Sequence, residues 1–85
     1  MLGLMKRSTL AIADIYVPVK RRATLDQKRV HEIAASILDK GLQAPIRVRV
    51  DGARFVLVEG LHRLEAAKAL GEETIVAFLV DAPKH

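Results

Sequence analysis

The 85-residue chain contains no cysteine and no tryptophan. The absence of cysteine excludes disulfides, thiolate metal ligands and a thiol nucleophile, and it fits a protein of the reducing cytoplasm. Aromatic residues make up only 4% of the chain, which leaves little for the base stacking used in single-stranded nucleic-acid binding. Apolar runs such as residues 75–80 are much shorter than the about 20 residues of a membrane-spanning helix, so we expect no membrane association.

The composition predicts one domain with its own hydrophobic core. With 51% apolar residues, a chain of this length can form a core without metal or disulfide support. No repeat, low-complexity tract or linker interrupts the sequence after residue 10. We therefore expect a flexible N-terminal segment over residues 1–10, a folded domain over residues 11–81 and a short tail over residues 82–85.

Positive charge is concentrated in the first half of the chain. The net charge is +4, but residues 1–50 contain ten basic and four acidic side chains, whereas residues 51–85 contain four and six. Such a distribution favours an anionic partner, for example DNA bound weakly and without sequence preference. An ordinary solvated surface can have the same composition. The candidate DNA-binding residues fall within one ten-residue window: Lys20, Arg21, Arg22, Lys28 and Arg29.

The periodicity of the first half predicts a strand followed by a helix. Residues 11–17 alternate as a short strand, which Pro18 ends because it cannot donate to a sheet ladder. Thr24 and Gln27 have the spacing of a capping box, and Gly41 is suited to end the helix that follows. The inward side of the strand is expected to comprise Ile12, Ile15 and Val17.

The second half predicts a hairpin, a helix and a last strand. Residues 46–50 and 54–58 have strand character and are joined by a turn at Asp51-Gly52. Helical spacing of apolar residues then extends from Leu61 to the helix terminator Gly71, and residues 74–80 return to strand character. The order strand, helix, hairpin, helix, strand indicates a small α+β domain with helices packed against a mixed or antiparallel sheet.

The turn from the hairpin into the second helix is the strongest candidate site. The first turn of a helix carries unpaired N–H groups and a positive dipole end, and Gly60 would let an anion approach them. His62 and Arg63 supply side-chain donors beside these groups. Glu59 could orient a metal-bound nucleotide or act as a base, or it could be an ordinary carboxylate at a helix N-terminus. No histidine has the spacing of a metal site.

Several of these segments together resemble the ParB N-terminal domain of the ParB/sulfiredoxin superfamily. The resemblance extends from Ile15 to Val80 and includes several family motifs in the family's order. The matching segments are the opening stretch from Ile15 to Arg22, which contains Pro18 and Arg21, Ser36-Ile37 leading to Gly41-Leu42, Pro45-Ile46-Arg47-Val48-Arg49, and Gly60-Leu61-His62-Arg63 followed by Ala66-Ala67.

The resemblance implies a nucleotide pocket like that of partition ParB proteins. It assigns phosphate contacts to Gly60, His62 and Arg63. The residues that it places around them are Gly41, Leu42, Gln43, Arg21 and Arg22. The family's Gly-Glu-Arg-Arg turn is altered here to Gly-Leu-His-Arg, which departs from the pattern associated with CTP hydrolysis and clamp closure.

The altered turn is similar to two other branches of the superfamily. Sulfiredoxins use Gly-Cys-His-Arg with a catalytic cysteine, and Leu61 stands at that position, so sulfiredoxin chemistry is excluded. Free serine kinases have an acidic residue where Glu59 stands, which leaves ATP-dependent phosphotransfer or hydrolysis open as an enzyme activity. The sequence contains no cluster of carboxylates that would suit a ParB-like nuclease.

The leading hypothesis is a ParB-like domain that binds CTP or ATP with Mg²⁺ and associates with DNA in plasmid or chromosome partition. The alternatives are a small phosphotransferase or nuclease, and a protein-interaction module with a vestigial pocket. The oligomeric state, monomer or homodimer, stays open. At 85 residues the chain has no room for the helix-turn-helix domain of partition ParB proteins, so we expect no site-specific DNA binding from it alone.

Overall fold

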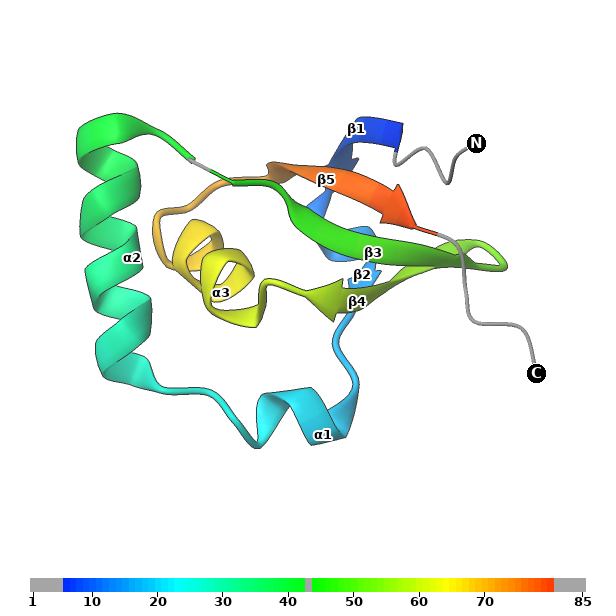
Figure 1. Ribbon diagram of the computed structural model, residues 1–85, viewed down its shortest axis with the longest axis horizontal. Helices are drawn as coiled ribbons and strands as arrows, with labels where there is room; N and C mark the ends of the chain where they lie inside the picture. Colours follow the sequence, from blue (N-terminus) through cyan, green and yellow to red (C-terminus); the bar gives the residue numbers. More distant parts are fainter. Residues whose placement is uncertain (1–5, 43, 81–85) are drawn as a thin grey trace.

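A five-stranded mixed sheet forms the centre of the computed structural model, which describes residues 6–42 and 44–80 (Figure 1). Its strands are β1 (Lys6–Ala11), β2 (Ile15–Tyr16), β3 (Ile46–Asp51), β4 (Arg54–Glu59) and β5 (Thr74–Val80). The spatial order is β1-β5-β3-β4-β2, with β3 parallel to β5 and antiparallel to β4. The helices are α1 (Val19–Arg22), α2 (Gln27–Lys40) and α3 (Leu61–Ala69). The α+β prediction is confirmed.

The core lies between one face of the sheet and α3. Strand side chains point alternately to the two faces, so Ile46 and Val48 of β3 are fully buried while Arg47 between them points to the other face. With Leu57 of β4 and Leu64 of α3 they are the largest fully buried side chains of the described residues. Helix α3 covers this face and α2 lies on the far side of α3, which gives the order sheet, α3, α2 (Figure 1).

The second half of the chain follows the sequence-based prediction. Strands β3 and β4 form an antiparallel hairpin, in which Asp51 pairs with Arg54 and Gly52 adopts a φ of 61° in the turn. Strand β5 has the bounds expected of the last strand. None of the helices in the described ranges is long and apolar enough to cross a membrane.

The first half differs from the prediction at the N-terminal segment. Residues Lys6–Ala11, most of which were assigned to a flexible segment, form β1 and pair antiparallel with β5 along their whole length. The strand expected over residues 11–17 is replaced by a 3-10 turn at Ile12–Asp14 and the two-residue strand β2. The expected inward residues Ile12, Ile15 and Val17 are buried, as predicted. Residues 1–5 and 81–85 lie outside the described residues.

The start of α2 also differs from the prediction. Thr24 does not cap α2: its hydroxyl donates a 2.7 Å hydrogen bond to the Arg21 carbonyl. Asp26 caps the helix instead, since its carboxylate accepts from the Lys28 N–H at 3.0 Å. The capping-box prediction was wrong because residues Val19–Arg22 form the separate helix α1, and the chain after it uses Thr24 to close that turn.

Candidate functional site

Gly60 forms the junction between β4 and α3. It adopts a left-handed conformation, with φ 106° and ψ 30°, at the N-cap of α3. A Cβ atom here would lie 2.7 Å from Cγ2 of Ile46, so the turn passes closer to β3 than any larger residue allows. No side chain caps α3, and its first backbone bond runs from the Leu64 N–H to the Gly60 carbonyl. The earlier N–H groups of α3 therefore have no helical acceptor.

His62 connects the starts of the two long helices. Its Nε2 accepts a hydrogen bond of 3.0 Å from the backbone N–H of Asp26, the N-cap residue of α2. Because Nε2 is the acceptor, the ring hydrogen belongs on Nδ1, which is the atom left to donate to a ligand. Only Nδ1 is therefore available for the predicted phosphate contact. His62 also holds the starts of α2 and α3 together, a role that the sequence did not indicate.

Arg63 connects α3 to the segment that precedes β3. Its Nη1 donates to the carbonyls of Pro45 at 2.7 Å and Ala44 at 3.2 Å. This leaves the Nε and Nη2 donors of the guanidinium for an anion. Fixing the side chain at one nitrogen lowers the entropy that it would lose on binding a phosphate.

Two adjacent hollows lie between α2 and the Gly60 turn. The first, of about 210 Å³, is lined by Arg29 and Ile33 of α2 and by residues 59–63. The second, of about 280 Å³, is more apolar and includes Ser36 and Leu42. Ile33 and Arg63 line both hollows, so together they form one groove along α2. We call it the α2 groove; it has a polar end at the turn and an apolar end near Gly41.

Arg29 enters the α2 groove although the sequence assigned it only to DNA. The helical period was the available signal, because Arg29, Ile33 and Ser36 are spaced four and three apart and so share one helix face. Gly41 and Leu42 line the apolar end, as the resemblance implied. Gln43, assigned to the same pocket, lies outside the described residues.

Arg21 and Arg22 do not join this groove. Arg21 lines a different hollow beneath α1, and Arg22 lines a third one that includes Tyr16 and Arg54. The expected pocket in which both arginines stand beside the Gly60 turn is therefore not formed. The reason is α1, since its single turn directs successive side chains about 100° apart and carries them toward the hairpin and β2.

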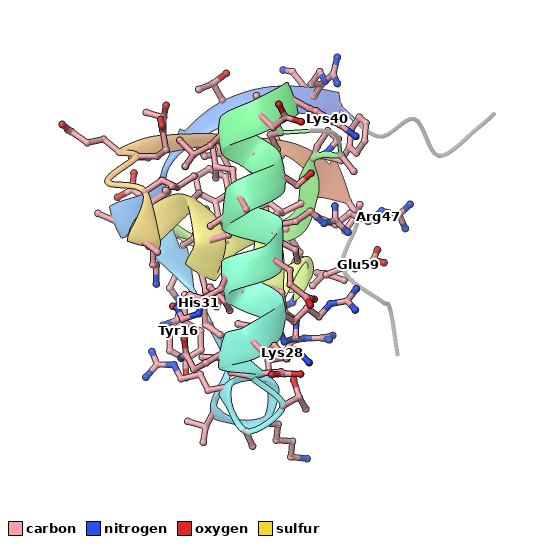
Figure 2. All side chains as sticks on the ribbon, turned by 90° about the vertical axis from the view of Figure 1, so that its left-hand side faces the viewer. Tyr16, Lys28, His31, Lys40, Arg47 and Glu59 are labelled. Atoms are coloured by element: carbon pink, nitrogen blue, oxygen red, sulfur yellow. The ribbon has the colours of Figure 1, made fainter. Side chains whose placement is uncertain are left out.

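Glu59 lies at the end of β4 in an exposed ion pair. Its Oε1 is 3.3 Å from Nε of Arg47 across the hairpin, and both side chains are about half exposed (Figure 2). Glu59 is also among the residues that line the polar end of the α2 groove. The described ranges contain no group of three or more histidine, aspartate or glutamate side chains that could hold a metal ion.

The basic window of residues 20–29 lies on the surface of α1 and the first turn of α2. All five of its cationic side chains belong to exposed residues. Lys28 is at the end of α2 nearest α1, far from Lys40 at the other end (Figure 2). The window is therefore exposed on two elements that are adjacent in the chain, and of its five cations only Arg29 lines the α2 groove.

Comparison with known proteins relates the chain to one sequence family and to solved structures of the same fold. The sequence pattern of the ParB N-terminal domain matches residues 5–85. A probable chromosome-partitioning protein ParB of Campylobacter jejuni is 42% identical over 68 residues, which is 80% of this chain and 24% of that protein. This chain thus spans about a quarter of the length of that partition protein.

Two solved structures share the fold. The crystal structure of sulfiredoxin from Arabidopsis thaliana matches with a TM-score of 0.81 and 32% identity, over 91% of this chain and 86% of that one. The C-terminally truncated chromosome-partitioning protein ParB from Caulobacter crescentus, complexed with CTP-γ-S, matches with a TM-score of 0.79 and 23% identity, over 93% of this chain and 46% of that one. The match with the second structure shows the fold alone.

Proposed function

The chain belongs to the ParB N-terminal domain family, and we propose that it binds a nucleoside triphosphate in the α2 groove as part of a DNA-partition function in the cytoplasm. The observation that carries this proposal is the convergence of an uncapped helix start with Arg29 and Arg63 at one hollow. An anion there meets backbone donors, a helix dipole and two guanidinium groups at once.

The shape of the α2 groove suits a nucleotide better than a simple anion. The polar end at Gly60 would take the phosphates, and Nδ1 of His62 would add a donor beside the backbone N–H groups. The apolar end lined by Ile37 and Leu42 would take the base, with Ser36 as a hydrogen-bonding group for it or the ribose. A nucleotide as the ligand is supported by the structurally similar Caulobacter protein, which was solved in complex with a CTP analogue.

The metal requirement belongs to the same proposal. Within the described ranges the protein offers no cluster of metal ligands at the groove, and Glu59 is the one carboxylate that lines its polar end. We therefore expect Mg²⁺ to enter with the triphosphate, held mainly by phosphate oxygens and water, which is the usual mode for this ion.

We also propose that the surface of α1 and the start of α2 binds DNA weakly and without sequence preference. Its cationic side chains are exposed and have no carboxylate partner among the described residues. They can therefore approach phosphates without breaking an internal ion pair. Such contacts release counterions, so the affinity should fall steeply with salt.

Isothermal titration calorimetry tests the nucleotide proposal. The protein is titrated with CTP, ATP and ADP, each with and without Mg²⁺, and we expect saturable heat with at least one triphosphate. The absence of heat with every nucleotide under both conditions would contradict the proposal. Inorganic triphosphate is the control, because equal affinity for it would show that the site contacts only the phosphates.

A second candidate function is phosphotransfer or hydrolysis from the same groove. The specific observation in its favour is that Glu59 lines the polar end of the groove together with His62 and Arg63. In phosphoryl transfer the protein acts mainly by positioning and charge stabilisation, which these groups could provide. Glu59→Gln separates this function from binding alone, because turnover should fall while nucleotide binding persists.

A further inference from the structure

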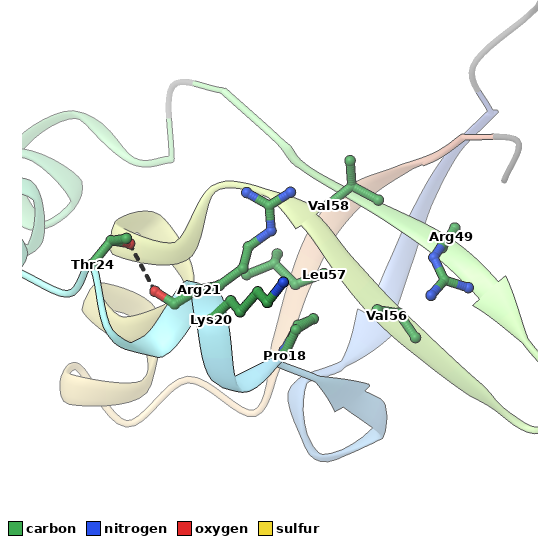
Figure 3. A pocket seen from close by; sticks show the side chains of 8 residues that line it. All are labelled: Pro18, Lys20, Arg21, Thr24, Arg49, Val56, Leu57 and Val58. Carbon is green, nitrogen blue, oxygen red and sulfur yellow. Dashed lines mark hydrogen bonds between the residues drawn. The ribbon is translucent and has the colours of Figure 1, made fainter. Parts of the chain in front are cut away.

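A second hollow lies beneath α1, away from the α2 groove. It has a volume of about 480 Å³ and is bounded by α1 on one side and by the outward-facing side of the β3–β4 hairpin on the other (Figure 3). Its apolar floor is formed by Pro18, Val56 and Val58. None of the residues that line it lines the hollow at the Gly60 turn.

Cations stand on both sides of this apolar floor. Lys20 and Arg21 reach over it from α1, and Arg49 lies across from them on β3 (Figure 3). Among the described residues, none of the three forms an ion pair with a carboxylate. The other hairpin arginines differ, because Arg47 pairs with Glu59 and Arg54 pairs with Asp51 while stacking on Tyr16. Of the three hairpin arginines, Arg49 at the hollow is therefore the one without a carboxylate partner among the described residues.

We propose that this hollow binds an acidic peptide segment of a partner protein, one bulky apolar side chain of which rests on the floor between flanking Asp or Glu residues. The combination of an apolar floor with a cationic rim selects this chemistry. A peptide with both kinds of side chain uses both features, whereas a nucleic-acid backbone would use the cations alone. Helix α1 has only four residues and contributes its side chains rather than its N-terminus.

The charge pattern also predicts which peptides should bind and which should not. Opposite charges at the rim speed association and exclude basic partners, and the buried apolar contact supplies most of the residence time. A segment that lacks the apolar residue should therefore bind weakly, and one with lysine in place of the acidic residues should not bind. The nucleotide in the α2 groove should have no direct part in either contact.

Nuclear magnetic resonance titration of the ¹⁵N-labelled full chain tests the proposal. The probe is the capped peptide Asp-Glu-Asp-Leu-Asp-Glu-Asp, and its controls replace Leu with Ser or the acidic residues with Lys. We expect shifts in the backbone amide signals of residues 19–24, 49 and 56–58, with those of 60–63 unmoved. The Ser peptide should bind about tenfold more weakly, in line with the loss of a buried aliphatic side chain.

Variants locate the contact. Arg21→Glu/Arg49→Glu should weaken the acidic peptide by about tenfold or more, because both reversed charges lie on the rim. Lys28→Glu/Arg29→Glu changes the net charge equally at exposed residues outside the hollow, and it should leave peptide binding within about twofold.

Four results would overturn the proposal. They are the absence of shifts at millimolar peptide, equal binding of the Leu and Ser peptides, equal loss in the two double variants, and displacement of the peptide by a short DNA duplex that perturbs residues 49 and 56–58, which lie outside the DNA surface of α1 and α2. The last result would assign the hollow to nucleic acid. CTP and ATP binding is measured on the same variants. Failure of the peptide proposal can then be told apart from failure of the nucleotide proposal.

Discussion

Nε2 of His62 accepts a hydrogen bond of 3.0 Å from the backbone N–H of Asp26, so the starts of α2 and α3 are joined across 36 residues of sequence. Both helices therefore direct the positive ends of their dipoles toward the same region. At α2 the Asp26 carboxylate provides compensation, whereas α3 begins at Gly60 with no capping side chain. A bound anion would supply at α3 the negative charge that Asp26 supplies at α2.

The His62–Asp26 contact yields the first prediction. His62→Ala removes the acceptor and should lower the free energy of unfolding by about 1 kcal/mol, the usual net value of one hydrogen bond. It should also weaken nucleotide binding, because the two helix starts are no longer held together. Urea denaturation and calorimetry measure the two effects.

Two further variants check this assignment. His62→Gln retains an acceptor atom in the side chain and should recover part of the stability, whereas a purely packing role would give no such recovery. His31→Ala, at an exposed position on α2, should leave both properties unchanged. Equal losses in the His62 and His31 variants would contradict the structural role of the contact.

The second prediction concerns the contact between Gly60 and Ile46. Gly60→Ala places a Cβ atom 2.7 Å from Cγ2 of Ile46 at a φ of 106°, so it combines a steric clash with backbone strain. We expect a loss of about 3 kcal/mol in unfolding free energy, from strain of about 1 to 2 kcal/mol and overpacking of similar size.

Gly71 provides a matched control for the steric part of this effect. It also has a positive φ, 81°, but a Cβ atom there would meet nothing within 4 Å. Gly71→Ala should therefore cost only the strain, about 1 kcal/mol. The two variants are compared by chemical denaturation, and similar losses in both would show that Ile46 does not restrict the turn.

The fold was predictable where local signals and tertiary contacts agree. Asp51-Gly52 marks the hairpin turn, and Gly60 and Gly71 flank α3, so these elements followed from the sequence. Strand β1 was missed because its order comes from pairing with β5, about 70 residues away, rather than from its own weak alternation. Such a long-range pairing has no local signal.

The candidate site was predictable only in part for the same reason. Gly60, His62 and Arg63 are consecutive or nearly so, and one helix start brings them together. The position of Arg29 depends on how α2 packs against α3, and that of Arg21 depends on the short helix α1, which the sequence did not indicate. The residue types were therefore predictable, but the hollows that these two arginines line were not.

The third prediction tests Arg29 as a nucleotide ligand. Arg29→Gln removes one guanidinium from the polar end of the α2 groove and should weaken triphosphate binding by about tenfold, the effect of one charge-assisted contact. The adjacent Lys28→Gln removes the same charge outside the groove and should change the affinity by less than about twofold. Calorimetric titrations of the two variants decide between a specific contact and a general charge effect.

The fourth prediction separates DNA binding from nucleotide binding by salt. DNA affinity that depends on Lys20, Arg22 and Lys28 should fall by about tenfold or more between low and physiological salt, because each phosphate contact releases a counterion. Nucleotide binding in the α2 groove should be less sensitive, since backbone donors there are fixed and partly shielded. Fluorescence anisotropy with a labelled duplex gives the salt slope. Charge reversal at these three positions without loss of DNA binding would show that the surface is only solvated.

The fifth prediction distinguishes binding from catalysis at Glu59. Glu59→Gln breaks an exposed ion pair with Arg47, which should change the unfolding free energy by less than about 1 kcal/mol. The same change removes a negative charge from the polar end of the α2 groove, so the triphosphate should bind as tightly as before or more tightly. Arg47→Gln breaks the same pair but leaves the carboxylate uncompensated, and it should weaken triphosphate binding instead.

Turnover in these two variants then decides between the candidate functions. If Glu59 acts as a base or positions a nucleophile, release of labelled phosphate from ATP or CTP should fall by about a hundredfold in Glu59→Gln, while nucleotide binding persists. Arg47→Gln should retain turnover at saturating nucleotide, because its carboxylate is intact. Turnover that survives in Glu59→Gln would remove this residue from the mechanism. A lack of turnover in the unmodified protein, together with the opposite affinity changes of the two variants, would assign Glu59 to tuning the charge of a binding site.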